Sequence, residues 1–71
     1  MKKGDNVRIF VNGEEKTIKS TTILGYLNEI EIDPQRIAVE LNLDILPKGD
    51  YDTTQLMDGD RIEIVHFVGG G

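Results

Sequence analysis

The alternation of apolar and polar residues predicts that the chain opens with a β-hairpin. In residues 7–11 every second side chain is aliphatic, which is the period of a half-buried strand. Asn12-Gly13 follows, and this pair favours a type I′ turn because both central positions of that turn need positive φ. Residues 15–19 then predict a second strand, antiparallel to the first.

Residues 22–31 predict a short amphipathic helix. Aliphatic residues recur there at helical spacing, and the hydroxyl residues just before them are candidate N-caps. Gly25 lies inside this segment and costs up to about 1 kcal/mol against alanine. We interpret it as a point of close approach between helix and sheet. Asp33-Pro34 ends the element, because the residue before a proline avoids the helical region.

The second half of the chain predicts two further strands separated by irregular structure. In order, we expect a strand over 37–43, a turn region over 46–50, one helical turn over 51–56 capped by Asp50 or Asp52, a tight turn at Asp58-Gly59 and a last strand over 61–68. This order predicts an α+β fold of the β-grasp, ubiquitin-like type, a mixed sheet with one helix packed across one face. The expected boundaries are a loose lead-in over 1–6, the domain over 7–68 and a flexible glycine tail over 69–71.

Composition narrows the functional classes. The sequence has 71 residues, 13 acidic and 8 basic, with a net charge of −5 and no cysteine. One domain is expected, and disulfides, thiolate metal sites and a catalytic thiol are excluded. The acidic excess indicates either solubility or a partner with a basic docking face. Scattered lysines argue against nucleic-acid binding, and the lack of a long apolar run argues against a membrane. We expect a cytoplasmic protein.

The candidate catalytic residues point to structural roles. His66 is the only histidine, so no histidine cluster is available to bind a metal. Ser20 lacks the glycine context of a nucleophile elbow and is interpreted as a cap of the helix. Asp58, Asp60 and Glu63 fit a turn and lack the spacing of an EF-hand loop. We therefore expect neither a metal site nor an enzyme that acts alone.

The last residues carry the candidate chemistry. Gly69, Gly70 and Gly71 follow an apolar strand without a polar linker. A frayed terminus is one interpretation, because glycine brings no side chain to pack. The other is a thread that enters a narrow tunnel in a partner and delivers the carboxylate of Gly71.

A second candidate site is an exposed apolar patch. If the aliphatic residues of the first and last strands face the core, Phe10, Val65 and Phe67 lie on the face that the helix leaves uncovered. Single exposed apolar residues are common, but a cluster marks a partner surface. We expect Phe10, Val65, Phe67 and Val68 to form a docking patch beside the tail.

Four blocks together resemble the thiamine-biosynthesis sulfur-carrier (ThiS) family. They are RIFVNGE at 8–14, IAVELN at 37–42, ILPK at 45–48 and DGDRIEIVHFVGGG at 58–71. Their order and spacing cover nearly the whole chain. The departures are the lead-in, Leu43 where the family often has glycine, and a third terminal glycine.

The resemblance implies a carrier that binds no cofactor and is not itself a catalyst. An adenylating enzyme of the ubiquitin-activating type would use ATP and Mg²⁺ to activate the Gly71 carboxylate. A persulfide sulfur, supplied through a cysteine desulfurase or another donor, would then produce a thiocarboxylate. A thiazole synthase would take the sulfur.

Two alternatives stay open at this point. The small subunit of molybdopterin synthase, or a carrier for another sulfur pathway, would share the fold and the terminal glycines. A ubiquitin-like modifier or a plain β-grasp binding module belongs to a different functional class.

Overall fold

A computed structural model describes residues 6–19 and 21–67 of the chain. Within these residues, five strands, one α-helix and two short 3-10 helices follow one another in the order β1 Asn6–Val11, β2 Glu14–Lys19, α1 Ile23–Glu29, η1 Pro34–Arg36, β3 Ile37–Leu41, β4 Asp44–Leu46, η2 Lys48–Asp50 and β5 Arg61–His66. Residues 1–5 of the expected lead-in and the expected tail at 69–71 lie outside the described residues, whereas Asn6 already belongs to β1.

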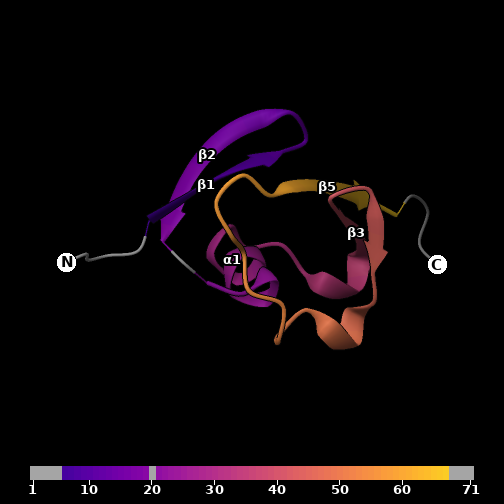
Figure 1. The fold of residues 1–71 in the computed structure, drawn as a ribbon. Coiled ribbons are helices and arrows are strands. Elements are labelled where there is room, and N and C mark those ends of the chain that lie inside the picture. Colours follow the sequence, from indigo (N-terminus) through magenta and orange to yellow (C-terminus); the bar gives the residue numbers. More distant parts are fainter. Residues whose placement is uncertain (1–5, 20, 68–71) are drawn as a thin grey trace.

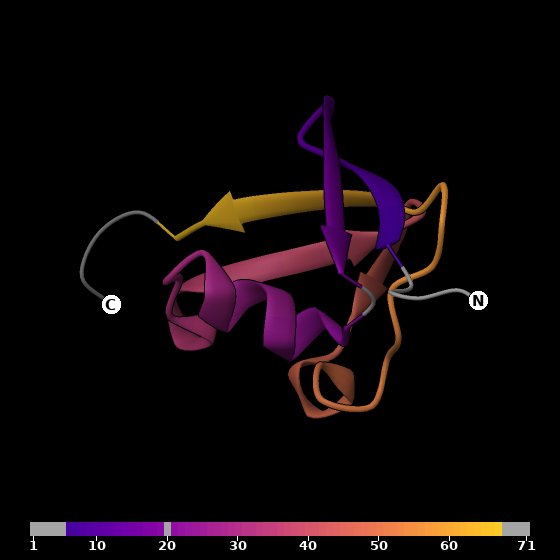
Figure 2. The same cartoon turned by 90° about the vertical axis from the view of Figure 1, so that its left-hand side faces the viewer.

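All five strands form one mixed sheet in the order β2-β1-β5-β3-β4. The first and last strands are neighbours, as the predicted order implies. They run parallel to each other, and the other described pairs are antiparallel. Helix α1 lies on one side of this sheet, which Figure 2 shows in side view below β3 and β5. The predicted arrangement of one helix across one face of a mixed sheet is therefore present (Figure 1).

The core lies between the helix and the inner face of the sheet. The side chains of Ile9 and Ile62 are almost completely buried, as their inward positions in the strand pattern predict, and Ile64 is buried with them. The other buried apolar residues come from every layer of the fold and are Ile23, Tyr26, Leu27, Ile37, Val39, Tyr51 and Leu56. Within the described part of the chain, no helix is long and apolar enough to cross a membrane.

Helix α1 begins at a hydroxyl cap, as predicted, and the cap is Thr22, whereas Ser20 lies outside the described residues. The Thr22 hydroxyl accepts a hydrogen bond from the Gly25 N–H at 3.0 Å. The helix ends earlier than expected, at Glu29, and the positive φ of 62° at Glu31 turns the chain away. Gly25 does not serve a close approach to the sheet, because the atom that a Cβ there would meet first is the hydroxyl oxygen of Thr21.

The second hairpin of the sheet was not predicted. The expected strand over 37–43 stops at Leu41, and Asn42 and Leu43 form a two-residue turn with φ values of 52° and 75°. The chain then returns as β4, antiparallel to β3. The expectation was wrong because leucine at a positive-φ position carries no turn signal, whereas the preceding Asn42 does.

The predicted position of a helical turn, over residues 51–56, was also wrong. The helical turn is η2, and Tyr51 is its C-cap. A turn continues to Thr54, whose N–H donates to the Asp50 carbonyl at 3.0 Å. Residues 54–56 then run against the helix start, where Leu56 N–H donates to the Thr21 carbonyl at 2.8 Å and Ile23 N–H donates to the Thr54 carbonyl at 3.0 Å. The predicted turn at Asp58-Gly59 is present, with a φ of 90° at Gly59.

Candidate functional site

The segment that precedes the glycines is fixed to the body of the fold at Phe67. Its N–H donates a hydrogen bond to the Arg36 carbonyl at 3.0 Å, so the chain is held in register for one residue beyond β5. Phe67 is 57% exposed. Val68, Gly69, Gly70 and Gly71 lie outside the described residues.

Lys48 connects this exit point to the rest of the domain. Its Nζ donates to the Ile37 carbonyl at 2.5 Å. The same ammonium lies 5.3 Å from the centre of the Phe67 ring and 5.7 Å from that of Tyr51, within the range of cation–π attraction. One cation thus joins η2, the start of β3 and the last described residue.

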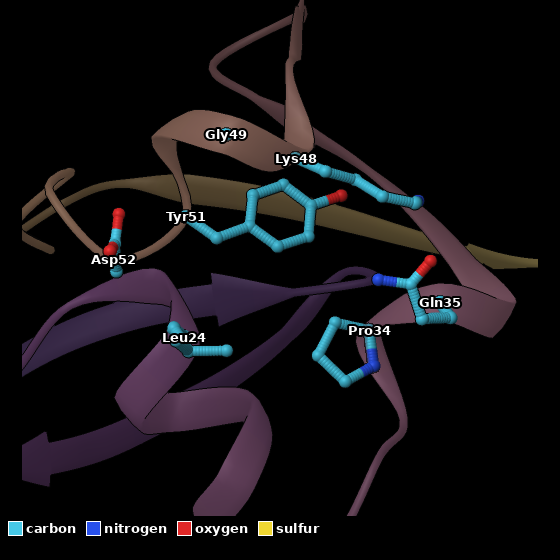
Figure 3. A pocket seen from close by; sticks show the side chains of 7 residues that line it. All are labelled: Leu24, Pro34, Gln35, Lys48, Gly49, Tyr51 and Asp52. Carbon is cyan, nitrogen blue, oxygen red and sulfur yellow. The ribbon is translucent and has the colours of Figure 1, made fainter.

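A shallow pocket lies next to this lysine (Figure 3). It has a volume of about 260 Å³ and is lined by Leu24, Pro34, Gln35, Lys48, Gly49, Tyr51 and Asp52. It forms where η1 and η2 face each other across the start of the helix. Burial raises the pKa of Tyr51, and the hydrogen bond between its hydroxyl and the Val39 backbone opposes the rise. The ring is therefore neutral near pH 7, and it contributes packing to this pocket.

The structure separates the residues of the predicted apolar patch. Val65 and Phe67 are both more than half exposed. Val65 lies on the face of β5 opposite to the buried Ile64, whereas Phe67 follows the end of the strand and its ring lies near Lys48. Phe10 is only partly exposed and pairs with Arg61, whose guanidinium lies 5.4 Å from the Phe10 ring. Val65 follows Arg61 by four residues, a distance of about 13 Å along a strand.

The prediction of one continuous patch was therefore wrong in its placement of Phe10, because the parallel register sets this residue at the far end of β5. The role of the remaining side chains in partner binding stays a prediction.

Sequence analysis missed Ile45 as a member of this surface. Ile45 is 76% exposed and pairs with Glu40, which in turn pairs with Glu63 on β5. Neither glutamate forms an ion pair with any residue that the structure describes. The uncovered face between β4 and β5 is thus a mixture of apolar side chains and unpaired carboxylates. Recognition of the turn after Leu41 would have revealed the alternation that places Ile45 there.

Asp58 and Asp60 have the turn roles predicted for them, whereas Glu63 lies on β5. Asp58 accepts a hydrogen bond from the Arg8 N–H at 2.8 Å, and Asp60 accepts one from the Met57 N–H at 2.8 Å. His66 is exposed at the end of β5. Among residues 6–19 and 21–67, no group of three His, Cys, Asp or Glu side chains could hold a metal ion.

Comparison with known proteins gives matches along most of the chain. The sulfur carrier protein ThiS of Bacillus subtilis is 43% identical over 63 residues, which cover 86% of this chain and 96% of that protein. Thiazole synthase of Paramagnetospirillum magneticum is 42% identical over 66 residues, or 92% of this chain and 20% of that protein. A second thiazole synthase, from Magnetococcus marinus, is 38% identical over 66 residues, which again cover 92% of this chain and 20% of that protein. The chain thus spans about a fifth of the length of these two curated relatives.

A solved structure and a family model agree with these matches. The crystal structure of the thiamine biosynthesis protein ThiS from Geobacter metallireducens superposes with a TM-score of 0.79 at 30% identity, over 92% of this chain and 100% of that one. The predicted β-grasp fold is confirmed by this likeness. The model of the ThiS family matches residues 9–71. The chain therefore belongs to the ThiS family.

Proposed function

We propose that this protein is a sulfur carrier of thiamine biosynthesis, with the sulfur attached at Gly71. The observation that carries the proposal is the match of residues 9–71 to the ThiS family, together with a relative named sulfur carrier protein that this chain covers over 96% of its length. The tail composition supports it, because three glycines bring no side chain that would block entry into a narrow active site.

The chemistry of such a carrier begins with a carboxylate, which is a poor electrophile. An adenylating enzyme that uses ATP and Mg²⁺ would convert the Gly71 carboxylate to an acyl adenylate and release pyrophosphate. The terminal sulfur of a persulfide, supplied through a cysteine desulfurase or another donor, would then displace AMP. Reduction of the resulting S–S bond by a thiol would leave the thiocarboxylate. In this scheme the protein is a co-substrate, and its partners are the catalysts.

The described residues have two tasks in this scheme. The hydrogen bond from Phe67 to Arg36 and the contact of its ring with Lys48 fix the point from which the tail starts. The exposed apolar side chains of Val65 and Phe67 offer a surface for docking beside that point. Docking near a fixed origin restricts the volume that the tail must search, which raises the effective concentration of its end in the partner's active site.

We further propose that a thiazole synthase receives the sulfur. The support is the two thiazole synthases that match this chain over a fifth of their own length, since a carrier segment within the same polypeptide as its acceptor would keep the two together. The cytoplasm is the compartment that we propose for these steps.

Intact-mass spectrometry tests the proposal. The protein is incubated with the adenylating enzyme, ATP, Mg²⁺, a cysteine desulfurase, cysteine and a thiol reductant. We expect a mass increase that corresponds to the exchange of one oxygen for one sulfur at Gly71, and no increase when ATP is omitted. A variant without Gly70 and Gly71 should fold normally and stay unmodified. If the wild-type protein keeps its mass, the proposal is wrong.

A genetic arm addresses the pathway. Expression of the protein in a strain that lacks its own thiamine sulfur carrier should restore growth without thiamine. Rescue of a strain deficient in the molybdenum cofactor, in place of the thiamine strain, would assign the carrier to another sulfur pathway.

A further inference from the structure

The sheet contains two turns of the same geometry but different sequence. Asn12-Gly13 joins β1 to β2 with φ values of 50° and 86°, and Asn42-Leu43 joins β3 to β4 with values of 52° and 75°. Both are two-residue hairpin loops with positive φ at both positions, which defines a type I′ turn. The two turns form an internal comparison, because only the second residue differs in kind.

Leucine is an unfavourable choice at the second position. An L-residue with a side chain is strained at positive φ, whereas glycine is not. Packing does not compensate the strain, since Leu43 is 85% exposed. Gly13 shows that the same sheet uses glycine at the equivalent position. Strain that brings no benefit to the fold is a reason to look for a function.

The turn that presents Leu43 is rigidly attached to β5. The Asn42 N–H donates to the Arg61 carbonyl at 2.7 Å, and the Asn42 Oδ1 accepts from the Arg61 N–H at 2.9 Å. The Asn42 Nδ2 donates to the Asp60 carboxylate at 3.0 Å. Three hydrogen bonds thus hold the turn, and little conformational freedom is left to lose when a partner binds.

The surroundings of Leu43 indicate the chemistry of a partner. Ile45 is 76% exposed two residues away, so two large aliphatic side chains protrude from one short hairpin. Asp44 is exposed between them, and neither Asp44 nor the neighbouring Glu40 forms an ion pair within the described part of the chain. The complementary surface is an apolar pocket with arginine or lysine at its rim.

We propose that the Asn42-Leu43 turn is the contact by which the adenylating enzyme selects this carrier, with Leu43 seated in an apolar pocket that has a cationic rim. The inference rests on the proposed sulfur-carrier function. A tail of glycines has no side chain by which an enzyme could recognise one protein among others, so recognition must come from the body. The adenylating enzyme acts on the unloaded carrier and therefore makes the first selection.

The position of the turn determines which kinetic parameter it controls. Leu41 pairs with Ile62 at the start of β5, whereas Ile37 pairs with His66 at its end, so Leu43 lies at the opposite end of the sheet from Phe67. A contact this far from the reacting carboxylate is the same in the ground state and the transition state. Its loss raises KM for the carrier and leaves kcat unchanged.

The test measures pyrophosphate release by the adenylating enzyme as a function of carrier concentration. Leu43→Gly should raise KM on the order of 5- to 100-fold, the effect of losing one buried isobutyl group, with kcat unchanged. The same variant should raise the melting temperature by roughly 2–8 °C, because the strain is relieved. Improved stability with weakened recognition is an outcome that a merely structural role of Leu43 would not give.

Three further variants assign the effect to the side chain. Leu43→Asn accommodates positive φ but is polar, and it should raise KM as Leu43→Gly does. Leu43→Met retains both strain and apolar surface, and its KM should stay within about threefold of the wild-type value. Gly13→Leu places leucine in the matched turn, where a Cβ meets no atom within 4 Å. It should lower the melting temperature without a change in KM.

The results separate this inference from the function on which it rests. No pyrophosphate release with the wild-type protein contradicts the sulfur-carrier function itself. Normal wild-type activity with an unchanged KM for Leu43→Gly overturns the docking role of the turn. The docking role at the adenylating enzyme is also overturned if Leu43→Gly slows only the later transfer of sulfur to a thiazole synthase. Asp44→Asn should lower the salt dependence of KM, because it removes a carboxylate of the carrier that would face the cationic rim of the enzyme's pocket.

Discussion

Asn12 binds Ile64 through both ends of its side-chain amide. The Oδ1 atom accepts a hydrogen bond from the Ile64 N–H at 2.7 Å, and the Nδ2 atom donates to the Ile64 carbonyl at 3.2 Å. The parallel register between β1 and β5 consists of Phe10 with Arg61 and Val11 with Ile62. The Asn12 side chain therefore continues the pairing of the central strands past the point where β1 turns away.

Replacement of Asn12 should destabilise the domain. Asn12→Ala removes both hydrogen bonds and leaves two partly buried backbone groups without a protein partner, so we expect a loss of about 1–3 kcal/mol in the free energy of unfolding. Urea denaturation measures this loss. Asn12→Gly is the control, because glycine adopts the φ of 50° without strain. If Asn12→Gly restores the wild-type midpoint, the turn conformation and not the amide is responsible.

Gly25→Ala should destabilise the protein although alanine is the better helix former. A Cβ at this position collides with the Thr21 hydroxyl. We expect the free energy of unfolding to fall by roughly 0.5–2 kcal/mol, as overpacking outweighs the gain in helix propensity. In a Thr21→Ala background the same change should stabilise, by up to about 1 kcal/mol. Thermal denaturation of the wild type, the two single variants and the double variant measures the coupling between the two positions. Additive effects would contradict the predicted collision.

Both tyrosines should titrate above their ordinary range. Burial raises the pKa of Tyr26 from 10.0, although the positive charge of Lys16 opposes the rise, and burial likewise raises that of Tyr51. Absorbance measured against pH should show that tyrosinate forms at a higher pH in the folded protein than in the protein unfolded in urea. A folded midpoint at or below 10.0 would be inconsistent with burial.

The same shifts give a pH dependence of stability with a defined sign. A raised folded-state pKa contributes stability that is complete below the unfolded-state value near pH 10 and is lost as pH rises through the folded-state pKa. The free energy of unfolding should therefore decrease above pH 10, and Tyr26→Phe should reduce that decrease.

Phe67→Ala should weaken docking more than Phe10→Ala does. Phe67 is 57% exposed beside the tail, so its loss should reduce affinity for the adenylating enzyme by about 1–3 kcal/mol if it is a binding hot spot. Phe10 lies against Arg61 at the far end of β5, and its replacement should change stability more than affinity. Isothermal titration and urea denaturation separate the two quantities. The reverse ranking would place the docking surface at Phe10.

Much of the fold could be predicted because local signals agree with the tertiary arrangement. The period-two pattern of residues 7–11 follows from burial of one face of β1, and Asn12-Gly13 fixes the first hairpin by its φ preference. The cap at Thr22 is equally local, since its hydroxyl bonds an N–H three residues away. Such features depend on neighbours in the chain, so a single sequence suffices to predict them.

The missed features depend on contacts between distant segments. Leu43 occupies a turn because Asn42 is held by Asp60 and Arg61, which lie 18 and 19 residues away. The helical turn η2 lies earlier than expected because residues 54–56 run extended against the helix start. Asn42 is a local turn signal, but the contacts that hold it, and those that hold residues 54–56, come from outside the segment.

The sequence by itself determined the order of β1, β2, α1, β3 and β5, the inward aliphatic faces and the glycine-rich end with its resemblance to sulfur carriers. The tertiary structure decided which side chains share a surface. The parallel register of β1 with β5 moved Phe10 away from Val65, and the return of β4 brought Ile45 beside Glu40. Pairing register is a property of two strands together, because a shift along the sheet changes every neighbour without changing the pattern in either strand.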